Sequence, residues 1–201
     1  MRFLNKLLSR RPAAGAGSRL REDRLRSVEG SQAAEQAAEM LSAPSALLQL
    51  SQEEARVVVG YMRPLRISEG TTFIREGDRE HTNFMLLLLE GDVTIESIVV
   101  SRTHPITVTV LGPGNLIGEM GLLDGEPRSA SCTAMGNLRC AILTRNALNQ
   151  LLLDDPQTAA KLMMAISLRI AERMRESQEK LKMYAQLTQA MQEEINALMP
   201  T

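Results

Sequence analysis

The chain has few residues that carry covalent or metal chemistry, with two cysteines and two histidines among 201 residues. Cys132 and Cys140 give neither a disulfide framework nor the spacing of a zinc site. Because they stand in apolar, strand-like segments, we expect them to be small buried side chains in a reducing cytoplasm. Neither His81 nor His104 has a partner at catalytic or metal-ligand spacing. We therefore expect no metal, no cofactor and no enzymatic activity.

Long apolar runs and a large net charge are missing as well. No apolar segment approaches the roughly 20 residues that a membrane span requires. The formal net charge is −1, so the whole chain has no electrostatic preference for nucleic acid or membranes. The N-terminal segment lacks the apolar core and cleavage site of a signal peptide. These absences favour a cytoplasmic protein.

The basic residues are concentrated at the start of the chain. Residues 1–45 are rich in Ala, Arg, Ser and Gln, and we expect a disordered tail because too little apolar surface offsets the entropy of ordering. A short amphipathic helix over residues 3–8, with Arg2 and Lys6 opposite Phe3 and Leu7, is the alternative. Such a helix would make weak contact with a membrane surface or a partner.

Residues 46–156 form the expected globular domain. Ser51 and Glu54 form a capping box that predicts a helix over residues 46–63, which Pro64 ends. From Leu65 on, short apolar segments alternate with glycine-based turns, the pattern of a β-sandwich, jelly roll or barrel. The expected strands are residues 72–74, 84–89, 93–95, 106–110 and 140–143.

Residues 157–199 predict one long helix with a coiled-coil seam. Steps of four and three give the seam Met163, Ser167, Ile170, Met174, Ser177, Leu181, Tyr184, Thr188, Met191, Ile195 and Leu198. Most of these positions are apolar, and about forty helical residues span roughly 60 Å, far more than one small domain covers. A homodimer is therefore expected, although the first part of the helix also fits packing on its own domain.

The segment from Leu116 to Ser131 carries the most specific pattern. Gly118 allows close backbone approach, and the N–H groups that open a short helix at residues 119–123 provide an anion site. Arg128 can offer a planar charged fork to a phosphate. Glu119 would repel a phosphate, so it suits hydroxyl donors. Anion capture beside diol capture indicates a sugar phosphate.

The chain resembles the cyclic-nucleotide-binding domain family, and this segment resembles its phosphate-binding cassette. The matching residues are Gly118, Glu119, Gly121, Leu122, Arg128, Ser129 and Ala130. The similarity covers residues of about 46–182 and is greatest to the sensor half of the bacterial catabolite activator proteins. It implies an α+β, mainly β fold: a jelly-roll barrel, or double-stranded β-helix, between a short N-terminal helix and a long C-terminal dimerisation helix.

The resemblance also implies roles for individual residues. Glu119 would bind the ribose 2′-hydroxyl and Arg128 the cyclic phosphate. The backbone of Gly118, Met120 and Gly121 and the hydroxyl of Ser129 would complete the pocket. Ser177, which stands on the long helix with Gln178, would contact the base, in the same chain or across a dimer. The alternative for Ser177 is a polar seam position that fixes register.

Several alternatives for the ligand and the output remain open. The ligand is expected to be cAMP more than cGMP, since Ser177-Gln178 resembles the helix of the adenine-binding relatives; a dinucleotide is also possible. No helix-turn-helix or basic recognition helix is visible, so we expect no DNA binding but signalling through a separate partner protein. Otherwise the domain could be a nucleotide-blind scaffold, with Arg128 and Glu119 forming only a surface salt bridge.

Overall fold

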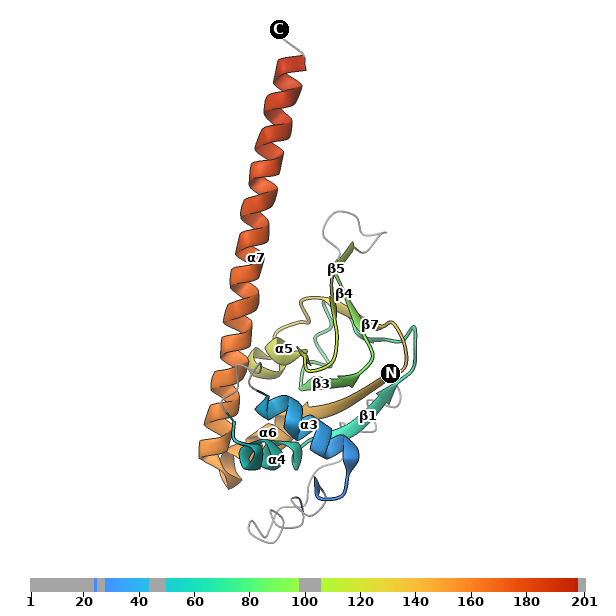
Figure 1. The fold of residues 1–201 in the computed structure, drawn as a ribbon, viewed down its shortest axis with the longest axis vertical. Coiled ribbons are helices and arrows are strands. Elements are labelled where there is room, and N and C mark those ends of the chain that lie inside the picture. Colours follow the sequence, from blue (N-terminus) through green and yellow to red (C-terminus); the bar gives the residue numbers. More distant parts are fainter. Residues whose placement is uncertain (1–23, 25–27, 44–49, 98–105, 199–201) are drawn as a thin grey trace.

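The computed structural model describes residue 24 and residues 28–43, 50–97 and 106–198. Eight strands form two four-stranded antiparallel sheets, against which helices pack at one side (Figure 1). The described strands do not close into the barrel that the sequence predicts. The expected α+β, mainly β fold with antiparallel sheets and a long C-terminal helix is present.

Each sheet combines strands from distant parts of the sequence. The first has the order β1-β8-β3-β6 and the second the order β2-β7-β4-β5. The strands are β1 (Arg63–Ile67), β2 (Thr72–Ile74), β3 (Phe84–Glu90), β4 (Val93–Ser97), β5 (Ile106–Leu111), β6 (Leu116–Ile117), β7 (Ser131–Ala134) and β8 (Leu138–Thr144). All five expected strands are present, while the sequence does not separately predict β1.

Strand β3 is buried on both of its faces, which explains its uninterrupted apolar sequence. Phe84, Leu86 and Leu88 point into the core between the two sheets. The alternate residues Met85, Leu87 and Leu89 belong to a second core beneath the helices. This alternation follows from the two-residue period of a strand, and it places β3 at the centre of a helix–sheet–sheet arrangement.

In the part of the chain that the structure describes, helices α3 and α4 precede the first strand. Helix α4 (Gln52–Val59) begins at the predicted capping box, in which Ser51 and Glu54 each accept from the other's backbone N–H. Helix α3 (Gln32–Ser42) lies within the segment predicted to be disordered, so that prediction is wrong for this helix. Its small residues Ala37 and Ala38 are fully buried in the helix-side core. Alanine favours helix formation and permits such close packing. Residues 3–8 lie outside the described residues.

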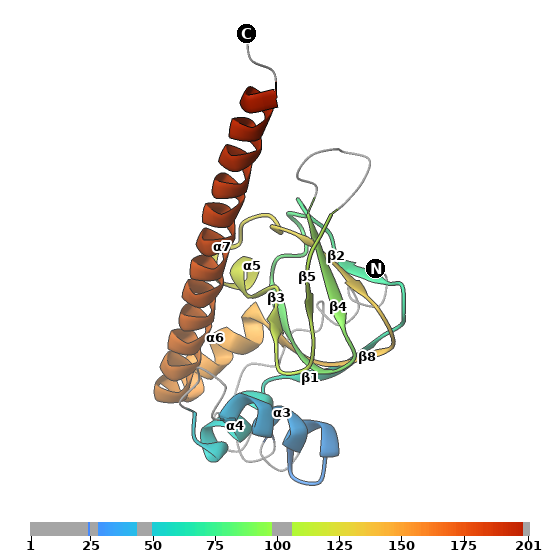
Figure 2. The same ribbon diagram turned by 45° about the horizontal axis from the view of Figure 1, so that its top comes forward.

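Two helices follow the last strand. The sequence does not predict α6 (Arg145–Asp154) as a separate helix, but α7 (Pro156–Leu198) has nearly the predicted bounds. The start of α7 packs on the core through Ala159, Leu162 and Ile166. Its C-terminal part projects well beyond the sheets (Figures 1 and 2). No helix among the described residues is long and apolar enough to cross a membrane.

Candidate functional site

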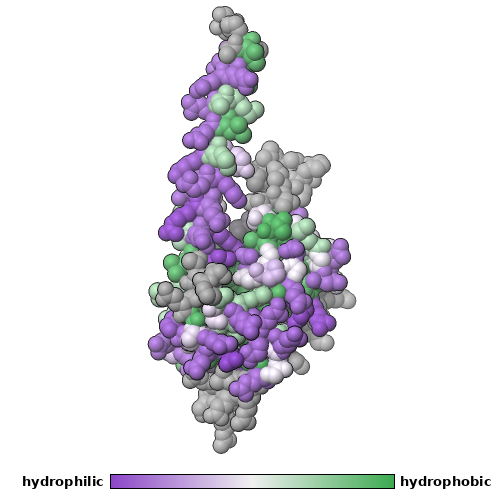
Figure 3. All heavy atoms as spheres, viewed as in Figure 1, coloured by the Kyte–Doolittle hydropathy of each residue, from purple (hydrophilic) through white to green (hydrophobic). Residues whose placement is uncertain are grey.

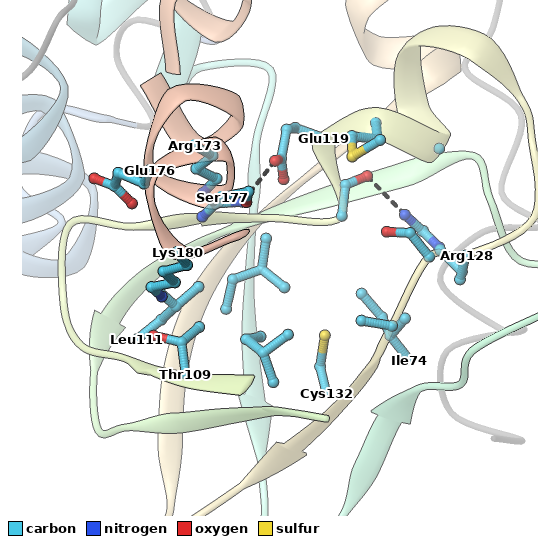
Figure 4. A pocket seen from close by; sticks show the side chains of 17 residues that line it. Ile74, Thr109, Leu111, Glu119, Arg128, Cys132, Arg173, Glu176, Ser177 and Lys180 are labelled. Atoms are coloured by element: carbon cyan, nitrogen blue, oxygen red, sulfur yellow. Dashed lines mark hydrogen bonds and ion pairs between the residues drawn. The ribbon is translucent and has the colours of Figure 1, made fainter. Parts of the chain in front are cut away.

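A cavity of about 430 Å³ lies between the second sheet, helix α5 (Glu119–Asp124) and helix α7. Figure 4 shows its side chains from close by. We call residues 118–121 and 128–130 the cassette wall. We call Arg173, Glu176, Ser177 and Lys180 of α7 the helix wall. Among the described residues there is no group of three or more His, Cys, Asp or Glu side chains that could hold a metal ion.

Glycine at two positions of the cassette wall makes room for an arginine. Gly118 has φ +81°, a left-handed conformation, and caps the N-terminus of α5. A Cβ atom on Gly118 would lie 2.7 Å from Nη1 of Arg128, and one on Gly121 would lie 3.0 Å from the same atom. The sequence suggests that Gly118 admits a ligand closely; in the structure its missing side chain admits the Arg128 guanidinium.

Arg128 is buried and held by backbone carbonyl groups. Its Nε donates to the carbonyl of His81 at 3.0 Å, Nη1 to Gly118 at 2.6 Å and Nη2 to Phe84 at 2.9 Å. The guanidinium also stacks on the ring of Phe84, 4.5 Å from its centroid. Burial lowers the pKa of Arg128 from its ordinary value, but arginine stays charged at neutral pH. Three of its five N–H groups are thus engaged, and the positive charge is fixed beside the cavity.

Glu119 pairs with the helix wall and not with Arg128. Nη1 of Arg173 donates to Oε1 of Glu119 at 2.7 Å, and Nη2 donates to the Leu116 carbonyl at 2.9 Å. The Glu119 side chain is only 5% exposed, against 36% for Arg173. The salt bridge between Arg128 and Glu119 that the scaffold alternative implies is therefore absent among the described residues, and Glu119 links the cassette to α7.

Most of the helix wall is not predicted from the sequence. The prediction names Ser177 alone, but Arg173, Glu176 and Lys180 share its face and line the same cavity. Their spacing of three, four and seven residues is the spacing of one helix face. Ser177 reaches the cavity of its own chain, and this spacing around it is the signal that could identify the other three residues.

The remaining lining is mostly apolar and comes from both sheets. It consists of Ile74, Ile95, Thr109, Leu111, Ile117 and Cys132. Burial raises the pKa of the Cys132 thiol to about 12, and that of Cys140 likewise to about 12. Both cysteines are free and buried, as the sequence predicts. The cavity therefore pairs apolar surface with a few charged groups, which is the usual character of a small-molecule site.

The structure brings all seven predicted site residues to this one cavity. Its lining includes Gly118, Glu119, Met120, Gly121, Arg128, Ser129 and Ser177. Six of them belong to the cassette wall, and Ser177 approaches from α7 (Figure 4). An arrangement with a fixed cation and a nearby buried carboxylate can hold an anionic group and a hydroxyl group side by side.

Known proteins resemble this chain in sequence and in fold. The family model for the cyclic nucleotide-binding domain matches residues 64–155. The cAMP-dependent protein kinase regulatory subunit of Dictyostelium discoideum is 28% identical over 115 residues, which make up 56% of this chain and 35% of that protein. The chain spans about a fifth to a half of the length of the curated relatives it matches.

Two solved structures support the same assignment. A cyclic nucleotide-binding domain from Methylobacillus flagellatus has 31% identity and a TM-score of 0.65, and the match covers 73% of this chain and 83% of that one. The catabolite activator protein of Thermus thermophilus has 27% identity and a TM-score of 0.59, with 73% and 63% covered. The chain therefore belongs to the cyclic nucleotide-binding domain family.

Proposed function

We propose that this chain is a non-enzymatic cytoplasmic sensor of a cyclic nucleotide, cAMP more than cGMP, that signals through a separate partner protein. The observation that carries the proposal is the buried Arg128 beside the buried Glu119 at one cavity. Two N–H groups of Arg128 remain for a cyclic phosphate after its three carbonyl bonds. The curated relative from Dictyostelium is named for its dependence on cAMP, which favours that nucleotide.

Glu119 suits the ribose. Its Oε1 accepts from Arg173, while Oε2 makes no hydrogen bond to a described residue and can accept from a 2′-hydroxyl. Met120 lies on the exposed surface of α5, so its backbone contributes more than its side chain. The hydroxyl of Ser129 and the backbone of Gly118 and Gly121 complete the phosphate end of the pocket.

Calorimetry tests the proposal. The wild-type chain should bind cAMP, and cGMP more weakly, with measurable heat at micromolar concentration. Arg128→Ala should reduce affinity by about a hundredfold or more, because truncating one partner of a buried charged contact costs about 2–5 kcal/mol. Arg139→Ala is the matched control, since Arg139 pairs with Glu90 at the surface away from the cavity. Absence of heat with both nucleotides would contradict the proposal.

The output requires a second surface, and α7 supplies one. Large apolar side chains such as Leu181, Tyr184 and Met191 are more than half exposed along its projecting part, where Figure 3 shows apolar patches. We propose that a second copy covers this seam to form a homodimer, whose changed surface a partner protein reads. A dimer that forms with no nucleotide binding would favour the nucleotide-blind scaffold instead.

Sedimentation measurements test the dimer. Leu181→Glu places a charge on the seam and should shift the chain to a monomer. Met183→Glu is the control, because Met183 is similarly exposed, at 59%, but stands off the seam. Dissociation by both substitutions, or by neither, would show that the seam is not the interface.

A further inference from the structure

The projecting part of α7 carries its charges unevenly. From Met183 to Leu198 the sequence has no basic residue, and its two acidic residues are Glu193 and Glu194. Glu194 therefore has no basic residue three or four positions away, where an ion pair on its own helix would form. Lys180, two heptads before Glu194, makes no hydrogen bond or ion pair with a described residue. Both side chains are exposed, so both charges are available to a second helix.

Lys180 and Glu194 flank the seam of α7 at equivalent positions. Lys180 stands one residue before the seam position Leu181, and Glu194 stands one residue before the seam position Ile195. Leu187 occupies the same flanking position midway between them, and its side chain is 57% exposed. This side of the seam thus has the order basic, apolar, acidic. Such an order complements a second copy of itself only when that copy runs in the opposite direction.

Helix direction decides which flanking residues meet across a seam. In a parallel pair, the residue before a seam position faces the residue five places further along the partner, so Lys180 would face the uncharged Ala185. In an antiparallel pair, equivalent flanking positions face each other. Lys180 then meets the partner's Glu194 at each end, and Leu187 meets its own copy between them. Because charged flanking positions set the orientation of paired helices, two ion pairs favour the antiparallel direction.

The seam residues fit the same reversed register. It places Tyr184 opposite the partner's Thr188 in the two central layers, so a large side chain faces a small one, which fills a core evenly. A parallel pair would instead place Tyr184 against Tyr184 and Thr188 against Thr188. The reversed register also aligns Met174 with the partner's Leu198. Since α7 is exposed from Met174 on, a reversed copy covers the seam from the point at which the helix leaves the core.

We propose that two copies of this chain pair in antiparallel fashion along residues 174–198 of α7, with their nucleotide-binding domains at opposite ends of the paired helices. Figure 1 shows this part of α7 projecting beyond the sheets, where a second helix has access. The proposal rests on the homodimer proposed above and adds its direction and register. Lys180 also lines the cavity, so the dimer contact and the cavity share one side chain.

Charge reversal tests the direction. In an antiparallel homodimer, Lys180→Glu brings two carboxylates together at each end, and Glu194→Lys brings two ammonium groups together. Sedimentation at low salt should show each variant dimerising about tenfold more weakly than the wild type. An equimolar mixture of the two variants should regain the wild-type affinity, because each chain then supplies the charge opposite to its partner's. The control Glu179→Lys with Lys182→Glu alters a pair on the outer surface of α7 and should leave dimerisation unchanged.

Disulfide cross-linking gives a second measurement that does not depend on charge. The reversed register places Leu181 opposite the partner's Met191, so a mixture of Leu181→Cys and Met191→Cys should form a mixed disulfide. Thr188→Cys should not cross-link to its own copy, because Thr188 faces the partner's Tyr184. The native cysteines are buried and do not compete. In a parallel dimer each of the three variants would cross-link to itself.

The outcomes separate the direction from the dimer itself. If Thr188→Cys cross-links to its own copy, or if mixing the two charge variants restores no affinity, the antiparallel direction is overturned while the homodimer stands. If the wild-type chain is a monomer at every concentration measured, the homodimer itself fails. Nucleotide binding is measured separately by calorimetry, so neither result bears on the proposed ligand.

Discussion

The two walls of the cavity are built in opposite ways. The cassette wall is buried and rigidly bonded, with Arg128 held by three carbonyl groups and enclosed by the glycines of α5. The helix wall is exposed from Met174 on, and only Arg173 joins it to the rest of the described site. A fixed charge favours strong, unselective anion capture. An exposed helix face favours recognition and movement.

This difference suggests a division of labour within one pocket. Because burial already holds Arg128 in place, its side chain need not be ordered when a ligand binds. The helix wall can change position at low cost, because few buried contacts hold it beyond Arg173. Substitutions in the cassette wall should therefore alter stability and affinity together. Substitutions beyond Arg173 should alter binding alone.

Gly118→Ala should have the largest effect on the free energy of unfolding. Gly118→Ala forces a side chain into a left-handed backbone, which costs about 1–2 kcal/mol. The new Cβ also lies 2.7 Å from Nη1 of Arg128 and 3.3 Å from the Phe84 carbonyl, so Arg128 must move. We expect a total loss of about 2–4 kcal/mol of unfolding free energy, measured by urea denaturation, together with weaker nucleotide binding.

A second glycine separates backbone strain from crowding. Gly114 has φ +84°, but no atom of a described residue lies within 4 Å of the place that a Cβ would take, so Gly114→Ala carries the conformational cost alone. Its loss should be about 1–2 kcal/mol, with affinity unchanged. Equal losses for the two variants would mean that the cassette wall does not depend on the fit of Arg128 against Gly118.

Arg173 is the bond between the two walls, and its removal should have the next largest effect. Arg173→Gln leaves the buried carboxylate of Glu119 without its charged partner, which costs about 1–3 kcal/mol. Thermal unfolding measures this loss, and calorimetry measures the accompanying change in nucleotide affinity. Arg169→Gln is the control, because Arg169 bonds to the partly exposed Glu172 and to Asn115. If Arg173→Gln lowers the free energy of unfolding less than Arg169→Gln does, the ion pair between Arg173 and Glu119 does not hold the two walls together.

The cassette wall is predictable from the sequence because the residues that shape it and the residues that would bind a ligand lie in one contiguous segment. A positive φ requires glycine at Gly118, and a lone arginine at Arg128, following an apolar strand and a short helix, indicates a binding role. Arg173 and Lys180 are not predicted, because a charge on a long helix is expected to face solvent until the fold shows which face meets the cavity. The ion pair between Arg173 and Glu119 is not predicted for the same reason.

Local sequence patterns likewise predict some elements of the fold and not others. The capping box at Ser51 predicts the start of α4, and the long periodic pattern predicts nearly the full length of α7. Helix α3 is not predicted because its buried residues are mainly alanines, whose small apolar surface is a weak sequence signal. Sheet closure depends on long-range pairing, which local patterns do not encode.

Acid should weaken the cassette side through Asp78. Burial acts to raise the pKa of Asp78, but hydrogen bonds from the backbone N–H groups of Glu80 and His81 outweigh it, so the pKa lies below the ordinary 3.8. The stability that Asp78 contributes is therefore present above 3.8 and is lost as the pH falls through the lower folded value. The adjoining backbone is tied to Arg128, whose backbone N–H donates to the Asp78 carbonyl at 3.0 Å.

Urea denaturation of the wild type and Asp78→Asn at about pH 6 and about pH 3 measures this contribution. The variant should be less stable by less than about 1 kcal/mol at the higher pH, and the gap should narrow at the lower one. If the difference in unfolding free energy between the wild type and the variant is the same at both pH values, the charge of Asp78 does not stabilise the fold.

The smallest effect is expected at Ser177, which tests the comparison from the helix side. Ser177 is exposed and makes no hydrogen bond to a described residue, so Ser177→Ala should leave the unfolding free energy unchanged. One lost hydrogen bond to the ligand costs about 0.5–1.5 kcal/mol, or about two- to tenfold in affinity by calorimetry. If Ser177→Ala leaves affinity unchanged but strengthens a dimer or alters its register, Ser177 acts as a polar seam position and not as a contact to the ligand.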